Sequence, residues 1–433
     1  MGFVGLGLIQ LVSRHGFARH VKAVRPAAEI IQSRGGGRTI RLVRRDFIKT
    51  TGAAIAGAQL VGVPVAGAST NSASQTPPKK RKVIYDQDNT GPLGTDMQGL
   101  LMLLQADNID LLGITVVTGD AWLKQELAYT LRLLEMMRRT EVPVFAGAEF
   151  PLINTKEEAL LRYDLFGGHR LDPHLGAFNR GNTGPDVIKP LPETYGRFAE
   201  IKHQQQHAAK FIIDTVRKYP NEVTLYAGGP LTNLALAVKL APDIVPLVPE
   251  VVFMGAGFHH FTNAFNVFFD PEAARIALRA PWPKFTVVTV DLAEEIHIYD
   301  ELRPGKLMVE EIVEKASSPI KDLFAVSLKN FNNGGRKAKG FRLPDEMMSA
   351  QIIEPSIFTK SGKFHIDINT SPGPRYGDSM LWDPVDGERA NLAGTTPQWP
   401  YGPPPSAGQV NVLLDLNRDR MKQLFVELMT KPI

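Results

Sequence analysis

Three aspartates follow the first apolar run after the N-terminal segment of the chain. Asp86 and Asp88 come directly after the run at residues 83–85, and Asp96 follows behind a loop that contains glycine. Because side chains alternate along a strand, Asp86 and Asp88 are expected on the same side of it. Carboxylates this close repel one another unless a cation lies among them, and hard oxygen ligands suit Ca²⁺ or Mg²⁺. The pattern predicts a divalent metal site, although turns and helix caps use the same residue types.

Later segments carry further groups that suit a ligand site. Residues 228–233 begin with Gly-Gly-Pro after an apolar run, and they form either a tight, capped turn or a loop whose carbonyls ligate a cation. The segment with Asn263 and Asn266 follows another apolar run, and the amide of Asn266 suits a sugar hydroxyl. Asp270, directly before a proline, has the pattern of a helix cap. Residues 382–384, Trp-Asp-Pro, supply one more carboxylate far along the chain.

From residue 83 onward, apolar runs alternate with amphipathic stretches that must position these groups. The apolar runs predict strands at residues 83–85, 111–117, 142–146, 223–227, 251–254, 286–290 and 410–414. Helical spacing predicts helices at residues 97–104, 123–137, 208–216, 231–239, 271–278 and 417–429. This alternation predicts an α/β fold with a mostly parallel central sheet and helices on both faces. Ligands bind beyond the carboxyl ends of such strands, where the irregular residues 151–206 and 318–381 are expected to form long loops.

Composition and charge limit the possible functions. The chain has 433 residues, of which 43% are hydrophobic, enough for a large core. It has no cysteine, which excludes disulfides, thiol catalysis and cysteine-based zinc sites. Residues 1–68 carry a net charge of +8, so the rest of the chain has −4 of the total of +4. The basic charge therefore belongs to the N-terminal segment, and no nucleic-acid partner is expected for the body of the chain.

The N-terminal segment has the layout of an export signal. Arg44 and Arg45 precede an apolar run of small residues, and Ala-Gly-Ala at residues 66–68 suits cleavage. The paired arginines resemble a twin-arginine signal, and a single membrane anchor is the alternative. We therefore expect an unstructured extension at residues 1–42, a signal at 43–68, a linker at 69–81 and one domain at 82–433. The protein would be periplasmic or secreted, without a stable membrane span after signal removal.

The motifs occur in an order that resembles the inosine–uridine nucleoside hydrolase family. The resemblance covers most of residues 82–433 and rests on residues 83–96, 113–120, 142–151, 228–233, 251–257, 263–274 and 382–384. Gly-Pro-Leu-Thr-Asn and Phe-Asn-x-x-x-Asp-Pro-Glu-Ala-Ala are its most specific segments. The resemblance implies Ca²⁺ at the carboxyl ends of the strands and hydrolysis of the N-glycosidic bond of ribonucleosides. It also implies a nucleoside as small-molecule substrate and a possible homo-oligomer.

The resemblance further implies roles for individual residues. The calcium ligands would be Asp88, Asp96, Asp383 and the main-chain carbonyl of Gly228, with Asp86 and Thr95 in support. Asp88 would take a proton from a calcium-bound water, while the surrounding carboxylates stabilise the positive charge that develops on the ribosyl ring. The substrate would contact Asn266, Met254, Asp120, Asn263 and Trp382.

Four positions depart from the family pattern. Thr95 stands where the first of two adjacent aspartates is usual. Asp120 replaces a usual asparagine, and Ala264 replaces a usual glutamate. Trp382 replaces a histidine that assists the leaving base in some members, and it could stack on a base or be buried in the core. The candidates for protonating the leaving group are His259, His260 and Tyr376.

Two other functions fit part of the pattern. Residues 86–90 also match the DxDxT signature of haloacid-dehalogenase-type phosphatases. In that interpretation Asp86 is a nucleophile, Asp88 an acid and base, and Mg²⁺ the ion, but residues 229–233 and 265–274 are left unexplained. The other alternative is a non-catalytic protein that binds nucleosides or sugars on the same fold, which the four departures motivate.

Overall fold

The structure, a computed structural model, describes the greater part of the chain beyond the N-terminal segment. The described residues are 79–91, 93–167, 174–258, 264–317, 319–334, 342–382 and 406–433. The predicted extension and signal lie outside them, as do Asn263, Asp383, His259 and His260. Within the described ranges, no helix combines the length and the apolar character that crossing a membrane requires.

A mostly parallel sheet forms the centre of the fold, as predicted. Its order in the described residues is β10-β9-β11-β6-β5-β4-β1-β2-β3. The strands are β1 (Arg81–Gln87), β2 (Ile109–Val116), β3 (Val144–Ala146), β4 (Val223–Ala227), β5 (Glu250–Met254), β6 (Phe285–Val288), β9 (Phe358–Ile368), β10 (Ser379–Trp382) and β11 (Gly408–Leu416). Every neighbouring pair from β11 to β3 is parallel, and β9 runs antiparallel to both β10 and β11. The carboxyl ends of β1, β2, β4, β5 and β6 therefore meet at one edge.

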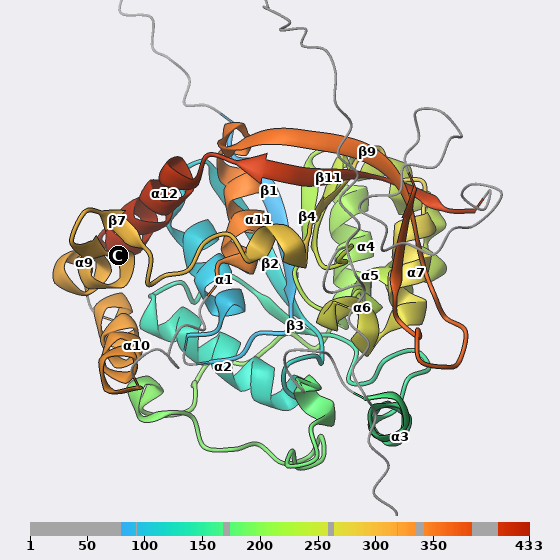
Figure 1. The fold of residues 1–433 in the computed structure, drawn as a ribbon, viewed down its shortest axis with the longest axis horizontal. Helices are drawn as coiled ribbons and strands as arrows, with labels where there is room; N and C mark the ends of the chain where they lie inside the picture. The colour runs from blue at the N-terminus through green and yellow to red at the C-terminus, as the bar shows by residue number, and fades with distance from the viewer. Residues whose placement is uncertain are drawn as a thin grey trace, which may run out of the picture. The chain divides into compact units, whose positions relative to one another are not determined.

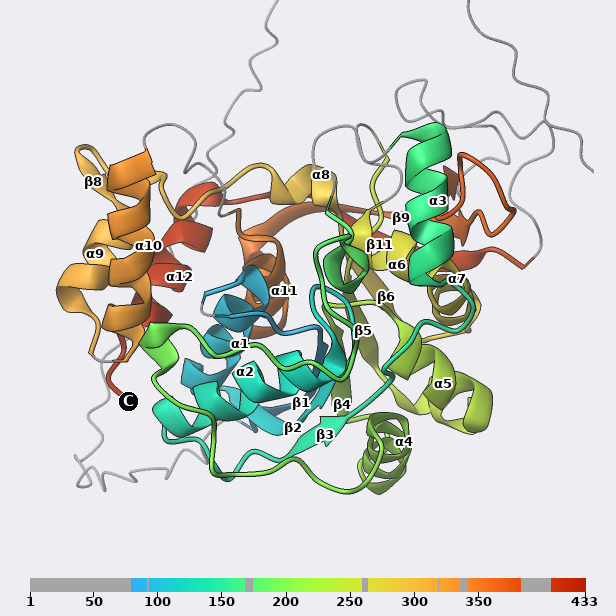
Figure 2. The ribbon, with the colours of Figure 1, turned by 90° about the horizontal axis from the view of Figure 1, so that it is seen from below.

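Helices cover both faces of the sheet (Figures 1 and 2). One face carries α1 (Thr95–Gln105), α2 (Leu123–Met136), α11 (Pro344–Ile353) and α12 (Arg418–Thr430), and the other carries α4 (Ala208–Lys218), α5 (Thr232–Leu240) and α7 (Pro271–Arg279). Alternation along β1 sends Val83 and Tyr85 into the first core and Ile84 into the second. Because both faces are covered, the central strands are apolar without interruption: β4 and β5 are buried at every residue.

The remaining elements lie around this core. They are α3 (Lys156–Phe166), α6 (Phe265–Phe269), α8 (Val290–Ala293), α9 (Met308–Lys315), α10 (Ile320–Gly334) and the hairpin of β7 (Glu301–Arg303) and β8 (Lys306–Leu307). Short 3₁₀ turns occupy Gly176–Phe178, Glu193–Tyr195, Pro242–Leu247 and Pro355–Ile357. Helices α9 and α10 pack together, and α9 also packs against α12 (Figure 1).

The prediction of long loops at residues 151–206 and 318–381 was wrong in part. The first range contains α3, and the second contains α10, α11, β9 and β10. Helix α11 has no exposed face, since Asp345 to Ile352 are all buried, so the sequence lacks the amphipathic spacing of a surface helix there. Strand β9 carries charged and polar residues in its first half, which interrupts the expected apolar run.

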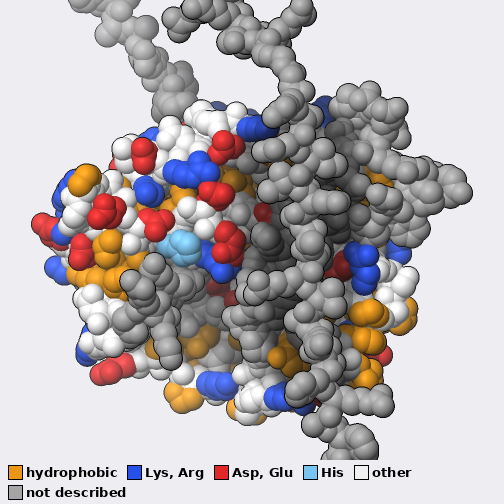
Figure 3. All heavy atoms as spheres, viewed as in Figure 1, with side chains coloured by type: hydrophobic (Ala, Val, Ile, Leu, Met, Phe, Trp, Pro, Cys, Tyr) orange, Lys and Arg blue, Asp and Glu red, His pale blue; other side chains and the backbone are white. Residues whose placement is uncertain are grey.

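The described surface carries charges of both signs. In the view of Figure 3, Lys and Arg side chains are mixed with Asp and Glu side chains over the side formed by α9, α10 and α12.

Asp270 joins three segments at one buried point. As the cap of α7, its Oδ1 accepts the N–H of Ala273 at 3.0 Å, which confirms the predicted helix cap. Its Oδ2 accepts the hydroxyl of Thr232 at 2.7 Å and the N–H of Leu152 at 2.9 Å. Burial raises the pKa of Asp270 to about 6. One carboxylate thus holds α5, α7 and the segment after β3 together.

We expect Asp270→Ala to lower the free energy of unfolding by about 2–4 kcal/mol, because it removes a cap and leaves two more buried donors unpaired. Denaturant unfolding measures this loss. The matched control is Thr155→Ala, which removes the cap of α3 at an exposed position where Thr155 Oγ1 accepts the N–H of Glu158 at 3.2 Å. This control should lose about 1 kcal/mol or less. Equal losses in the two variants would contradict the role of Asp270 as a buried junction.

Candidate active site

Asp88 lies at the tip of β1, between two backbone segments that approach it closely. Its Oδ2 accepts the N–H of Asp120 at 3.0 Å. A Cβ on Gly119 would stand 2.0 Å from Asp88 Oδ2, and a Cβ on Gly229 would stand 2.6 Å from Asp88 Oδ1. The carboxylate is therefore enclosed by glycine backbone from the loops after β2 and β4. The Gly-Gly-Pro turn does reach the site, as one of the two sequence interpretations required.

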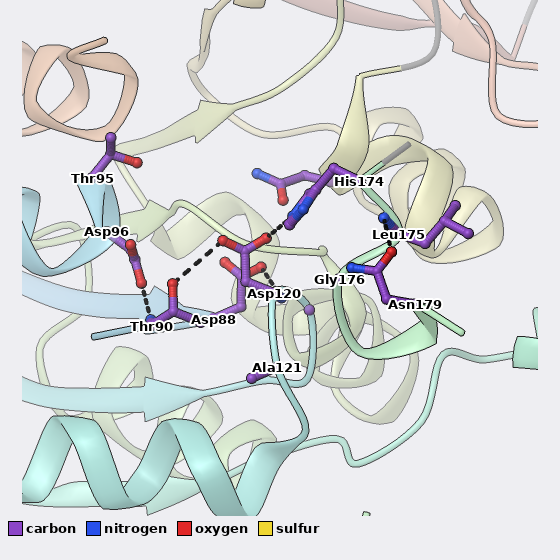
Figure 4. Close-up of polar contacts among 12 residues, drawn as sticks. Asp88, Thr90, Thr95, Asp96, Asp120, Ala121, His174, Leu175, Gly176 and Asn179 are labelled. Carbon is purple, nitrogen blue, oxygen red and sulfur yellow. Dashed lines mark hydrogen bonds and ion pairs between the residues drawn. The ribbon is translucent and has the colours of Figure 1, made fainter. Parts of the chain in front are cut away.

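Thr95 and Asp96 open α1 beside Asp88 (Figure 4). Asp96 accepts the N–H of Thr90 through Oδ2, and its own main-chain oxygen accepts the Tyr85 hydroxyl at 2.5 Å. The hydroxyl of Thr95 donates to Oδ2 of Asp345 at 2.5 Å. The threonine that replaces a family aspartate thus holds another carboxylate in the site.

Asp345 is a site residue that sequence reasoning missed. It lies in the first turn of α11, 250 residues from Thr95, and it is 6% exposed. Gln87 donates to its Oδ1 at 3.1 Å, and Tyr226 donates to its main-chain oxygen at 3.1 Å. The sequence feature that could have identified Asp345 is the acidic pair directly after Pro344, at the start of an apolar segment. The same pattern is common at the start of any helix, so it did not indicate a site.

Electrostatics link these carboxylates into one cluster. Burial raises the pKa of Asp88, and the charges of Asp120, Asp96 and Asp345 raise it further. Burial likewise raises the pKa of Asp96, with added repulsion from Asp120 and Asp345. Burial raises the pKa of Asp345 to about 6, against the hydrogen bonds from Thr95 and Gln87. Burial therefore makes all three groups harder to ionise, neighbouring carboxylates add to the effect, and a cation among them would reverse it.

The described side chains do not converge to metal-binding distances in this structure. Among them, no group of three or more acidic or histidine side chains is arranged closely enough to hold an ion. Asp96 instead accepts the N–H of Thr90, and Asp345 accepts Thr95 and Gln87. The predicted third carboxylate, Asp383, lies outside the described residues.

Asp86 positions the elements around the site, and its side-chain hydrogen bonds in the described chain go to residues other than Asp88. Its Oδ1 accepts the hydroxyl of Thr115 at 2.5 Å and the side-chain amide of Asn233 at 2.8 Å. Oδ1 of Asn233 in turn accepts the N–H of Ala148 at 2.8 Å. Burial raises the pKa of Asp86 to about 6. Asp86 thus ties the ends of β1 and β2 to α5.

Asn266 joins the loops after β4 and β5. Its amide donates to the main-chain oxygens of Gly228 and Met254, the latter at 2.9 Å. The structure therefore brings together three of the predicted site residues, and the Gly228 carbonyl faces the amide of Asn266.

A loop after β2 carries Asp120 and is held by two residues that the sequence did not single out. Glu126, fully buried in α2, accepts the N–H groups of Gly119 at 3.3 Å and Ala121 at 2.7 Å. His174 Nε2 lies 2.6 Å from Oδ1 of Asp120 (Figure 4). A cavity of about 190 Å³ opens beside this loop and is lined in part by Asp120, Trp122, Gln125, Tyr129, Asn182 and Lys189.

In the described part of the chain, two predicted residues have neighbours other than Asp88, Asp96 and Asp345. Trp382 ends β10, the edge strand, and five strands separate β10 from β1 in the sheet. The side chain is buried at the sheet edge, so the structure does not bring Trp382 to Asp88. Tyr376 donates to Glu272 Oε2 at 2.7 Å, and the Arg162 guanidinium lies 4.2 Å from its ring centre. Tyr376 therefore joins α7 to α3.

A family model described as inosine-uridine preferring nucleoside hydrolase matches residues 83–423. The chain belongs to this nucleoside hydrolase family. It is therefore an N-glycosyl hydrolase, and this assignment decides against the phosphatase interpretation. The family resemblance seen in the sequence is confirmed, and so is the fold it implied.

Relatives and solved structures of nucleoside hydrolases resemble this chain over most of its length. The pyrimidine-specific ribonucleoside hydrolase RihB of Escherichia coli K12 is 30% identical over 70% of this chain and 87% of its own. Among solved structures, a plant nucleoside hydrolase has a TM-score of 0.58 at 20% identity and covers 81% of this chain and 99% of its own. A purine-preferring ribonucleoside hydrolase from Gardnerella vaginalis has a TM-score of 0.58 at 21% identity and covers 81% and 98%. These structures share the fold of this nucleoside hydrolase.

We expect Gly119→Ala to reduce kcat/KM by about 100-fold, because the new methyl group displaces the Asp88 carboxylate, and displacements near 1 Å cost about that much. Steady-state kinetics measure the loss, and thermal unfolding verifies the fold of the variant. Gly184→Ala is the control, since a Cβ at Gly184 meets nothing within 4 Å. Unchanged activity in Gly119→Ala would show that the position of Asp88 does not depend on this approach.

Proposed function

We propose that this nucleoside hydrolase cleaves the N-glycosidic bond of ribonucleosides, with Ca²⁺ held by Asp88, Asp96 and Asp345 and with Asp88 as the general base. The proposal rests mainly on one observation. Three carboxylates from the tip of β1, the start of α1 and the start of α11 lie buried at the carboxyl edge of the sheet, and burial raises the pKa of each; the charge of Asp345 further raises the pKa of Asp88 and of Asp96. Asp345 takes the role that the sequence implied for Asp383, because Gln87 and Thr95, the residues directly before Asp88 and Asp96, both donate to its carboxylate.

The donor set fits a hard divalent cation. All three side chains offer carboxylate oxygens, the ligands that Ca²⁺ prefers, and each is no more than 6% exposed. Glycines 94, 119 and 229 stand where a Cβ would collide with Asp96 or Asp88, so side chains at these positions would displace the proposed ligands. The main-chain oxygen of Gly228 is a further candidate ligand beside them. When bound, calcium would lower the pKa of a water molecule and would bind the ribose hydroxyls.

The chain's own residues supply the remaining chemistry. Breaking the bond builds positive charge on the ribosyl ring, and the buried carboxylates stabilise that charge. The N–H of Asp120 holds Oδ2 of Asp88, which orients the carboxylate to take the proton of the attacking water. Asn266, held at its amide by two carbonyls, presents its side-chain oxygen to a ribose hydroxyl.

Ribose is the part of the substrate that these residues recognise. The named relatives include a pyrimidine-specific and a purine-preferring enzyme, and what their substrates share is the ribosyl bond. The aromatic and amide groups around the cavity beside Asp120 suit the planar base. We therefore propose ribonucleosides as the substrate class.

We expect the purified full-length protein to release ribose and free base in equal amounts from ribonucleosides when Ca²⁺ is present. Asp88→Ala should lower kcat by about 10³-fold, since a general base contributes about 10²–10⁴-fold. A reducing-sugar assay over a panel of purine and pyrimidine ribonucleosides measures this release. The control is Asp107→Ala, an aspartate whose side chain is 92% exposed. Binding of nucleosides without ribose release would favour the non-catalytic alternative.

The ion is tested separately. We expect a chelator to abolish activity and added Ca²⁺ to restore it, and Asp345→Asn should raise the Ca²⁺ concentration for half-maximal activity by about 100-fold, because one charged ligand is lost. Ca²⁺ should also raise the melting temperature of the wild type more than that of the variant, since ligand binding stabilises the folded state. Asp107→Asn should respond like the wild type. A Ca²⁺ response in Asp345→Asn equal to that of the wild type would remove Asp345 from the ligand set.

A further inference from the structure

His174 lies at the carboxyl edge of the sheet and contacts the site through Asp120. Its Nε2 is 2.6 Å from Asp120 Oδ1, so Nε2 donates and the carboxylate accepts. The main-chain N–H of Asp120 binds Oδ2 of Asp88 at 3.0 Å. The imidazole is therefore two hydrogen-bonded contacts away from the proposed base. The side chain of His174 is 43% exposed, so a ligand can reach it.

The ring is also held from a second direction. The centre of the Phe265 ring in α6 lies 4.8 Å from the centre of the His174 ring. Phe265 directly precedes Asn266, whose amide binds the oxygens of Gly228 and Met254. His174 thus stands between the loop with Asp120 and the helix with Asn266. The other described histidines have different neighbours: His207 caps α4, His203 contacts its neighbour Gln204, His297 lies 4.0 Å from Asp300, and His365 lies in β9.

The chemistry leaves one task to be assigned. A nucleobase leaves poorly as an anion. Cleavage therefore needs one group that donates a proton to the nucleobase and another that accepts a proton from the attacking water. In the proposed function, Asp88 accepts the proton of the attacking water. His174 is an imidazole at the edge of the same site, and a carboxylate hydrogen bond to one ring nitrogen stabilises the imidazolium and orients the other nitrogen.

We propose that His174, oriented by Asp120, is the general acid that protonates the leaving base; the inference rests on the proposed function. The C1′–N bond breaks, and its electron pair passes to the base nitrogen. The proton on Nδ1 of the His174 imidazolium bonds to a nitrogen of the base, while water adds its oxygen to C1′ and gives a proton to Asp88. Exchange with solvent returns a proton to His174 and removes one from Asp88, so the sum is nucleoside plus water to ribose plus base.

Asp120 has two tasks in this arrangement. Its main-chain N–H binds the proposed general base, Asp88. Its side chain binds the proposed general acid, His174. The hydroxyl of Thr90 lies 3.5 Å from the second carboxylate oxygen of Asp120, which keeps Oδ1 turned to the imidazole. The asparagine that is usual at this position carries no charge and could not stabilise an imidazolium in this way. The replacement of asparagine by Asp120 is therefore explained by the proposed role of His174.

The test compares two substrates in the full-length protein with Ca²⁺. One is a ribonucleoside, whose base needs a proton; the other is 4-nitrophenyl β-D-ribofuranoside, whose leaving group does not. We expect His174→Ala and His174→Gln to lower kcat on the ribonucleoside by about 100-fold or more while changing kcat on the nitrophenyl riboside less than about 5-fold. Asp120→Asn should show the same selective loss in weaker form. His203→Ala is the control and should match the wild type on both substrates.

The outcomes separate this inference from the proposed function. If the wild type cleaves neither substrate, the proposed function fails. If the wild type cleaves both, and the His174 variants lose activity equally on both or on neither, then His174 is not the general acid, although the proposed function stands. A selective loss on the ribonucleoside supports the inference, because a merely structural defect would reduce both rates alike.

Discussion

Repulsion among buried carboxylates is the constraint on which the rest of this structure depends. Asp88, Asp96 and Asp345 lie at the carboxyl edge of the sheet, and their hydrogen-bond donors in the described residues are neutral N–H, hydroxyl and amide groups. Like charges in a region of low dielectric destabilise the folded state unless a cation joins them. The large apolar cores on both sheet faces supply the free energy that holds the three groups together.

The fold and part of the site follow from the sequence because they depend on local patterns. Continuous apolar runs predicted β1, β2, β4, β5 and β6, since strands buried on both faces have few polar residues. Asp88, Asp96 and Gly229 were found because they directly follow such strands or open the next helix. Asp270 was found from the proline behind it. In each case the neighbouring residues carry the information.

The residues that sequence reasoning missed reach the site through tertiary packing. Asp345 comes from a helix that is buried all round, so no amphipathic pattern marked its start. His174 contacts the Asp120 side chain, Glu126 accepts the N–H groups of Gly119 and Ala121 on either side of it, and only the folded loop shows those contacts. Trp382 precedes an aspartate and a proline, a pattern that suggested a site, yet it ends an edge strand far across the sheet. Local motifs do not reveal which edge of a sheet a late strand will occupy.

The packing of α11 against α1 fixes the positions of two of the proposed calcium ligands. The hydroxyl of Ser349 in α11 donates to the main-chain oxygen of Gly99 in α1 at 2.8 Å, and a Cβ on Gly99 would stand 3.2 Å from the Cβ of Asp345. The spacing between the carboxylates of Asp96 and Asp345 is therefore fixed by two interlocked core helices and not by the surrounding surface segments. A change in those surface segments would therefore leave the spacing of these two carboxylates in place.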